Sequence, residues 1–150
     1  MLVLKYGVLA LALLLAAAVA YVRFAPLDVA GLHVDPETAE RPRPRGQFLV
    51  RVGGDLEPRV FEGPTNALTR QLQRVIAATP RTELLAGDLA TGHASYVTRS
   101  GLWGFPDVAS IKVVDIGDGT SSALILSRQV YGIEDLGVNK ARVLGWLDQL

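Results

Sequence analysis

Apolar residues fill the first part of the chain without any polar face. Between Leu2 and Val22 the only charged residue is Lys5, and the centre is built from Leu and Ala, which form helices well. A helix over residues 6–22 would be about 26 Å long, near the lower limit for crossing a bilayer core of about 30 Å. A helix that is apolar all round has no face for water. The pattern therefore predicts a single membrane-inserted segment within residues 1–23, with the membrane as partner of residues 2–22.

Three interpretations of this segment stay open. We favour an uncleaved anchor, because apolar character continues to the end of the run and aromatic residues flank it at Tyr6, Tyr21 and Phe24. A secretory signal is the second, with Lys5 in the charged region and a cleavage-like triplet at Ala18–Ala20. A helix buried in a soluble core is the third. Positive charge precedes the run and acidic residues follow it, which favours insertion in the cytoplasmic membrane with the rest of the chain on the extracytoplasmic side.

Proline then interrupts regular structure over residues 24–46. The stretch Arg41-Pro-Arg-Pro-Arg45 cannot be helical, because each proline removes a backbone donor and pushes the preceding residue to an extended conformation. We predict a polyproline-like linker here. Its arginines could contact anionic headgroups, although a solvated linker is the simpler interpretation.

Two stretches of residues 47–150 have apolar positions at helical spacing, over 65–79 and 138–150. Pro64 and Thr65 suit the start of the first, with Thr65 as a candidate N-cap, and Pro80 ends it. Asp135 or Asn139 could cap the second. The buried stripes are predicted to be Leu68, Leu72, Val75, Ile76 and Thr79 in the first helix, and Val143, Trp146, Leu147 and Leu150 in the second.

Short apolar runs predict strands at 48–52, 60–61, 81–85, 93–99, 111–116 and 121–130. Gly117–Thr120 is a strong signal for a tight hairpin, and strands joined by short loops are antiparallel. Leu124–Leu126 is apolar on both faces, as in an interior strand. We predict a two-layer α+β domain with an antiparallel sheet of four to five strands in a meander and two helices on one face. A pocket would then lie on the other face or at the ends of the sheet.

Composition narrows the possible functions. The 150 residues suffice for one small domain, and their net charge of zero argues against nucleic acid as a partner. The absence of cysteine excludes disulfides, thiol catalysis and thiolate zinc sites. Neither His33 nor His93 has another metal ligand at suitable spacing, so we expect no metal and no cofactor.

Two segments, 96–107 and 127–142, place Arg, Asp and Ser beside glycines at predicted strand ends. The candidate ligand-binding residues are Tyr96, Arg99, Ser100, Asp107, Ser127, Arg128, Asp135, Asn139 and Arg142. Each segment also has a purely structural interpretation. Residues 135–142 could form the start of a helix, residues 105–107 could form a turn with a buried aromatic ring, and Arg99 could pair with Asp107.

The same positions resemble a bacterial and plant family, domain of unknown function 1499. In that family a Tyr-bearing strand leads through Arg-Ser to a Gly-Phe-x-Asp turn, and a later strand ends in Ser and Arg before a Gly-x-x-Asp-x-Gly-x-Asn-x-x-Arg segment. The chain matches with Tyr96, Arg99, Ser100, Gly104, Phe105, Pro106 and Asp107, then Ser127, Gly132, Asp135, Gly137, Asn139 and Arg142. It departs with Gln129 and with Val130, where members often carry Arg, a role that Arg128 could take over. The resemblance covers about residues 47–150 and implies no reaction, cofactor or ligand.

Three hypotheses for function follow. The leading one is a membrane-tethered, envelope-facing, non-catalytic module that binds a ligand or a partner. The second is a hydrolase-like enzyme that uses Asp107 or Asp135 as general acid or base and arginines to hold an anionic substrate. The third is a structural subunit of a membrane assembly, which an exposed apolar patch near Trp103 or Trp146 would support.

Overall fold

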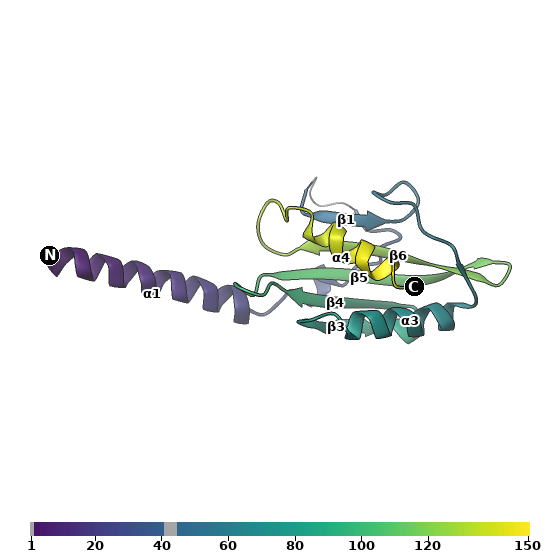
Figure 1. Ribbon diagram of the computed structural model, residues 1–150, viewed down its shortest axis with the longest axis horizontal. Coiled ribbons are helices and arrows are strands. Elements are labelled where there is room, and N and C mark those ends of the chain that lie inside the picture. The colour runs from purple at the N-terminus through teal and green to yellow at the C-terminus, as the bar shows by residue number, and fades with distance from the viewer. Residues whose placement is uncertain (1, 41–44) are drawn as a thin grey trace.

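The computed structural model describes residues 2–40 and 45–150, and it shows a long helix projecting from one end of an α+β domain (Figure 1). The elements in chain order are α1 (Leu2–Phe24), α2 (Val29–Leu32), β1 (Gln47–Val50), β2 (Phe61–Glu62), α3 (Thr65–Ala77), β3 (Thr82–Asp88), the 3-10 turn η1 (Leu89–Thr91), β4 (His93–Arg99), β5 (Pro106–Gly117), β6 (Thr120–Gln129) and α4 (Val138–Leu147). The predicted α+β class is confirmed.

The sheet has the strand order β1-β6-β5-β4-β3, with β2 paired to β6 beyond the end of β1. Every pairing is antiparallel, and β3 to β6 form the predicted meander. Asp118 and Gly119 connect β5 to β6, and both have positive φ, as a tight two-residue hairpin requires. Ile125 and Leu126 in the centre of β6 are fully buried, which confirms the predicted interior strand.

Strand β5 is twice as long as the prediction of 111–116, which was wrong at its N-terminal end. It begins at Pro106, which pairs with Arg99 of β4. Proline is tolerated as the first residue of a strand because its missing N–H falls outside the ladder. The turn is confined to residues 100–105, so Asp107 lies within a strand. Phe105 is 42% exposed, and the expected buried aromatic ring is therefore also wrong.

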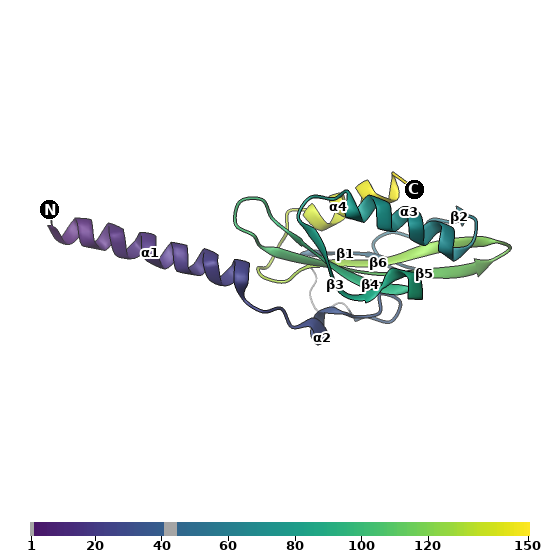
Figure 2. The same ribbon diagram turned by 90° about the horizontal axis from the view of Figure 1, so that it is seen from below.

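Helices α3 and α4 cover one face of the sheet, as predicted (Figure 2). The core lies between them and the sheet, and it includes Leu72 and Ile76 of α3, Ile111 and Ile125 of the sheet, and Trp146 of α4. The short helix α2 lies on the opposite face, which is called the open face below. This helix was not predicted, because its four residues fall in a stretch broken by prolines.

The starts of the two core helices differ in part from the prediction. Pro64, not Thr65, is the N-cap of α3, and it makes no side-chain capping bond. Helix α4 follows Gly137, which adopts the left-handed conformation that glycine accommodates most easily. Asp135 caps this helix from two residues further back, because its carboxylate accepts hydrogen bonds from the N–H groups of Gly137 and Asn139.

Helix α1 contributes nothing to the domain core. Residues Leu4–Phe24 are apolar enough to cross a membrane, and none of this span is buried inside the protein. A helix in the core of a soluble domain would be largely covered, so that interpretation is wrong. The remaining two, anchor and signal, both fit a helix outside the domain. Within the predicted linker of residues 24–46, residues 41–44, which make up most of the Arg41-Pro-Arg-Pro-Arg45 stretch, lie outside the described residues.

Candidate functional site

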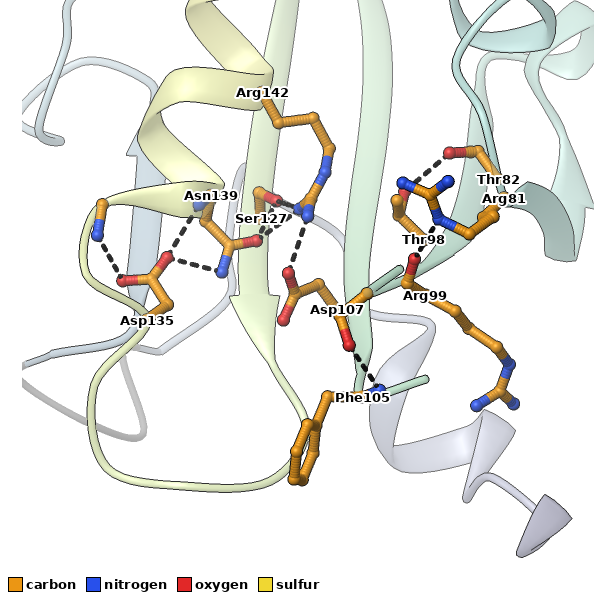
Figure 3. A network of polar contacts seen from close by, with 12 residues as sticks. Arg81, Thr82, Thr98, Arg99, Phe105, Asp107, Ser127, Asp135, Asn139 and Arg142 are labelled. Atoms are coloured by element: carbon orange, nitrogen blue, oxygen red, sulfur yellow. Dashed lines mark hydrogen bonds and ion pairs between the residues drawn. The ribbon is translucent and has the colours of Figure 1, made fainter. Parts of the chain in front are cut away.

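Five of the nine candidate residues meet on the helix-covered face, at the end of the sheet nearest α1 (Figure 3). Asp107 comes from β5 and Ser127 from β6, where alternation directs both side chains toward the helices. Asp135 lies in the loop before α4, and Asn139 and Arg142 lie one turn apart on α4. We call these five residues the α4 network.

Asn139 is the centre of the α4 network. Its side-chain amide donates to Asp135 Oδ2 at 2.7 Å, and its Oδ1 accepts from Ser127 Oγ at 2.6 Å and from Arg142 Nη1 at 2.8 Å. Arg142 Nη2 then pairs with Asp107 Oδ2 at 2.6 Å. The result is a continuous chain of hydrogen bonds that ties the first turn of α4 to the two central strands.

This network is largely closed to solvent. Asn139 and Ser127 are fully buried, and the side chains of Arg142 and Asp107 are only 10% and 16% exposed. Burial raises the pKa of Asp107 above its ordinary value, and Arg142 offsets this only in part. Burial would also raise the pKa of Asp135, but the hydrogen bonds from Asn139 and Gly137 outweigh it and leave that pKa below its ordinary value.

The predicted ion pair between Arg99 and Asp107 is wrong. Asp107 pairs with Arg142 on the helix-covered face of the sheet. The side chain of Arg99 points to the open face of β4, away from Asp107, and donates to the carbonyl of Gly104 at 3.2 Å. Ser100 shapes the same loop, because its Oγ accepts from the N–H of Phe105 at 2.9 Å. These two candidates therefore organise the loop between β4 and β5.

The last two candidates also lie away from the α4 network. Arg128 points to the open face, where it donates to the carbonyls of Gly31 and Leu32. Tyr96 faces the helices at the margin of the core, and burial followed by the charge of Asp88 raises the pKa of its hydroxyl. Arg128 thus cannot replace, within the α4 network, an arginine missing at position 130.

A second polar cluster on the open face was missed from the sequence. The rings of His33 and His93 stack with centroids 4.2 Å apart. Ser110 donates to the carbonyl of Leu32, so the hydroxyl of Ser95 donates to Ser110 and His33 Nδ1 donates to Ser95. His93 Nε2 donates to the carbonyl of Val34 at 3.0 Å. Burial and then the neighbouring His33 lower the pKa of His93.

Charged residues also attach the segment after α2 to the open face of the sheet. Lys112 Nζ lies 2.7 Å from both Asp35 and Glu37, and these hydrogen bonds raise its pKa. Arg51 donates to the carbonyls of Pro36, Glu37 and Ala39. In the sequence, His93 and Ser95 of β4 and Ser110 and Lys112 of β5 alternate with apolar residues, which is the pattern of a face exposed to water and gave no sign of this attachment.

A groove of about 710 Å³ lies beside this segment, on the face opposite the helices, as predicted for a pocket. Its floor is formed by side chains of β5 and β6, and its walls by residues 37–38 and 51–60. The lining is mainly apolar with charged residues at the rim, and it comprises Glu37, Thr38, Arg51, Val52, Glu57, Pro58, Val60, Val114, Ile116, Ser122 and Leu124. None of the nine candidates lines this groove.

No group of three or more potential metal-ligating side chains from His, Cys, Asp and Glu occurs in the described part of the chain. Comparison with known proteins gives one match. A family model described as protein of unknown function (DUF1499) matches residues 34–150. The chain belongs to this family. No curated protein and no solved structure matches the chain significantly. The DUF1499 match begins at Val34, so it includes Asp35 and Glu37, which attach the segment after α2 to Lys112 on the open face.

Proposed function

We propose that this DUF1499 protein is a membrane-anchored, envelope-facing module that binds an apolar ligand or partner segment in its open-face groove without catalysing a reaction. Helix α1, which lies wholly outside the domain, carries the proposal. Its 23 residues make up a helix longer than the roughly 30 Å bilayer core requires. Lys5 and the N-terminal amine before the apolar run favour a cytoplasmic N-terminus and an external domain.

The α4 network supports a structural role for the residues most typical of the family. The side chains of the network make their hydrogen bonds to one another. A catalytic carboxylate, by contrast, needs a substrate proton within hydrogen-bond reach. Asp107 is held by Arg142, and Asp135 is held by two backbone N–H groups and an amide. The hydrolase-like alternative retains one favourable observation, the raised pKa of Asp107.

The groove supports binding because ligand sites are concave, mainly apolar and equipped with a few polar groups. Val60, 63% exposed, and Ile116, 48% exposed, offer apolar surface to an occupant. Glu57 in the lining disfavours an acidic ligand, while Glu37 is paired with Lys112 and Arg51 donates to three backbone carbonyls. The chemistry therefore favours an uncharged apolar group.

Two experiments test the proposal. Cells that express the full chain are fractionated, the membranes are washed at alkaline pH, and protease is added to intact spheroplasts. We expect the protein to stay in the membrane fraction and to be digested from outside. Recovery as a soluble cytoplasmic protein would refute the anchor.

Binding is tested with the fluorophore-labelled Val60→Cys variant, since the chain has no other cysteine. Titration with decanol should give a saturable change in emission that a label at Lys140→Cys, at an exposed position of α4, does not show. Equal, non-saturating responses at both positions would refute binding in the groove.

A further inference from the structure

Two loops at the α1 end of the domain carry large apolar side chains into solvent. The β4–β5 loop contributes Leu102, 76% exposed, and Trp103, 49% exposed. The β6–α4 loop contributes Leu136, 90% exposed, and Ile133, 82% exposed. The antiparallel order places both loops at one end of the sheet, and Figures 1 and 2 show them beside the end of α1. We call these two loops the α1-proximal loops.

The α1-proximal loops lie level with the point where α1 ends. Arg23, in the last turn of α1, packs against the β4–β5 loop, because a Cβ atom at Gly104 would lie 3.2 Å from Arg23 Cγ. Phe24, the last residue of α1, is 78% exposed beside it. Any membrane that contains α1 thus brings its interfacial region to the height of these loops, and Trp favours that region.

Arginines surround a hollow of about 150 Å³ between α1 and the sheet. It is lined by Arg23, Arg81 and Arg99, together with Glu83, Val97 and Ser100. Within the described residues, none of the three arginines lies within ion-pair distance of a carboxylate. Guanidinium groups bind phosphate oxygens well, since their donors form a planar fork.

The opposite end of the domain has the opposite charge. The β5–β6 hairpin carries Asp115 and Asp118 and lies farthest from α1 (Figure 1). Of the two acidic residues in the β6–α4 loop, Glu134 is paired with Arg45 at 3.4 Å and Asp135 is hydrogen-bonded to Gly137 and Asn139. Beside α1 the apolar tips are accompanied by the three arginines of the hollow, which outnumber its one carboxylate, Glu83, and complement an anionic bilayer surface.

We propose that the α1-proximal loops insert their apolar tips into the bilayer interface and that the arginine hollow binds the phosphate of anionic lipid headgroups. This inference rests on the anchoring role of α1 in the proposed function. It adds that the domain stands on the membrane in a fixed orientation, with the hairpin and the groove beside it away from the lipid. A domain on a flexible tether would have no fixed orientation, so its loops would have no preferred contact with lipid.

The test uses the full chain reconstituted into vesicles of phosphatidylcholine with and without phosphatidylglycerol. Single cysteines at Leu102→Cys and Leu136→Cys, with Asp118→Cys at the hairpin as the matched control, carry an environment-sensitive fluorophore. All three positions are exposed, so these substitutions leave the core intact. We expect lipids with nitroxides near the headgroup to quench most of the emission at positions 102 and 136 and little at 118.

The arginine hollow is tested by Arg81→Gln, with Arg70→Gln on α3 as control. Phosphatidylglycerol should strengthen the quenching at position 102 in the parent chain and in Arg70→Gln, and this gain should shrink in Arg81→Gln. Equal gains in all three proteins would overturn headgroup binding by the hollow.

Two results would overturn loop insertion while the anchor stands. Labels at 102 and 136 as accessible to water as the label at 118, in vesicles that retain the protein after an alkaline wash, would show loops free of lipid. Labels shielded from water but not quenched by nitroxide lipids would show that another protein surface covers them. Loss of the protein from the washed vesicles would instead refute the anchor of the proposed function.

Discussion

The central prediction concerns Asn139→Ala in the α4 network. This substitution removes a fully buried amide that makes three side-chain hydrogen bonds. The hydroxyl of Ser127 loses its acceptor in a fully buried site. Arg142 Nη1 loses its 2.8 Å bond and keeps only a 3.4 Å contact with Ser127, while Nη2 stays paired with Asp107. Asp135 keeps the N–H groups of residues 137 and 139. Two groups are therefore left poorly satisfied, and one is partly compensated.

The magnitude follows from these losses. A buried polar group left without its partner costs about 1–3 kcal/mol, so the two groups together cost about 4 kcal/mol. Alanine favours a helix by roughly 0.5 kcal/mol more than asparagine, which offsets a small part. We expect the free energy of unfolding to fall by about 3 kcal/mol. For a domain of about 100 residues this lowers Tm by roughly 10–20 °C.

The assay is urea unfolding of the full chain with Trp103→Phe in detergent micelles, so that the fluorescence reports Trp146, which is 2% exposed in the core. Lys140→Ala, at an exposed position next to Asn139 on the same helix, is the matched control and should change stability by less than about 0.5 kcal/mol. If Asn139→Ala were no less stable than Lys140→Ala, the α4 network would not hold the helix to the sheet. The residues that carry the resemblance on α4 would then need another explanation.

Four further predictions concern single side chains, and the first three use the same assay. Because hydrogen bonds lower the pKa of Asp135, the stabilisation that its carboxylate gives the folded state is complete above the unfolded-state pKa and is lost as pH falls through the folded-state pKa. The free energies of unfolding of the parent and of Asp135→Asn should therefore converge in acid. A constant difference between them would contradict this. Because burial raises the pKa of Asp107, the parent should gain stability relative to Asp107→Asn as pH falls through the folded-state pKa, and a relative loss there would show the opposite shift. Because the pKa of His93 is lowered in the folded state, the parent should lose stability as pH falls from about 7 to 5, and His93→Gln should lose less. Parallel curves of unfolding free energy against pH would contradict a lowered pKa of His93. Trp146→Phe removes the 2.8 Å bond from Trp146 Nε1 to Thr79 Oγ1 and should cost about 1–2 kcal/mol, most of which Thr79→Val should reproduce if the bond matters; thermal unfolding followed by circular dichroism measures both.

The meander was predictable because its signals are local. Strand-favouring residues at Tyr96, Val97 and Thr98 mark β4, and the Gly117–Thr120 turn joins β5 to β6 with residues that favour positive φ. The start of β5 was missed because Gly104 and Pro106 are typical of turns in sequence. Only the pairing with β4, which the local sequence does not encode, makes Pro106 the first residue of a strand.

The candidate site was only partly predictable for a different reason. Sequence identified Asp107, Asn139 and Arg142 as specified positions, but the choice of partner depends on the rotation of α4 over the sheet, which no local spacing determines. The histidine pair was missed because His33 reaches His93 across 60 residues of chain. Its segment contains proline, and such segments are usually assigned to linkers.

The two polar clusters together explain how the central strand pair keeps its register. Apolar residues at 124–126 of β6 suit either face of the sheet, so hydrophobicity alone would tolerate a slip by one residue. Such a slip would move Ser127 away from Asn139 and exchange its place with Arg128, which binds the segment after α2 on the open face. A slip by one residue would therefore break hydrogen bonds on both faces of the sheet. It is disfavoured because buried polar groups without partners are costly. The residues that carry the family resemblance can in this way specify one fold, and none of them lines the groove on the open face.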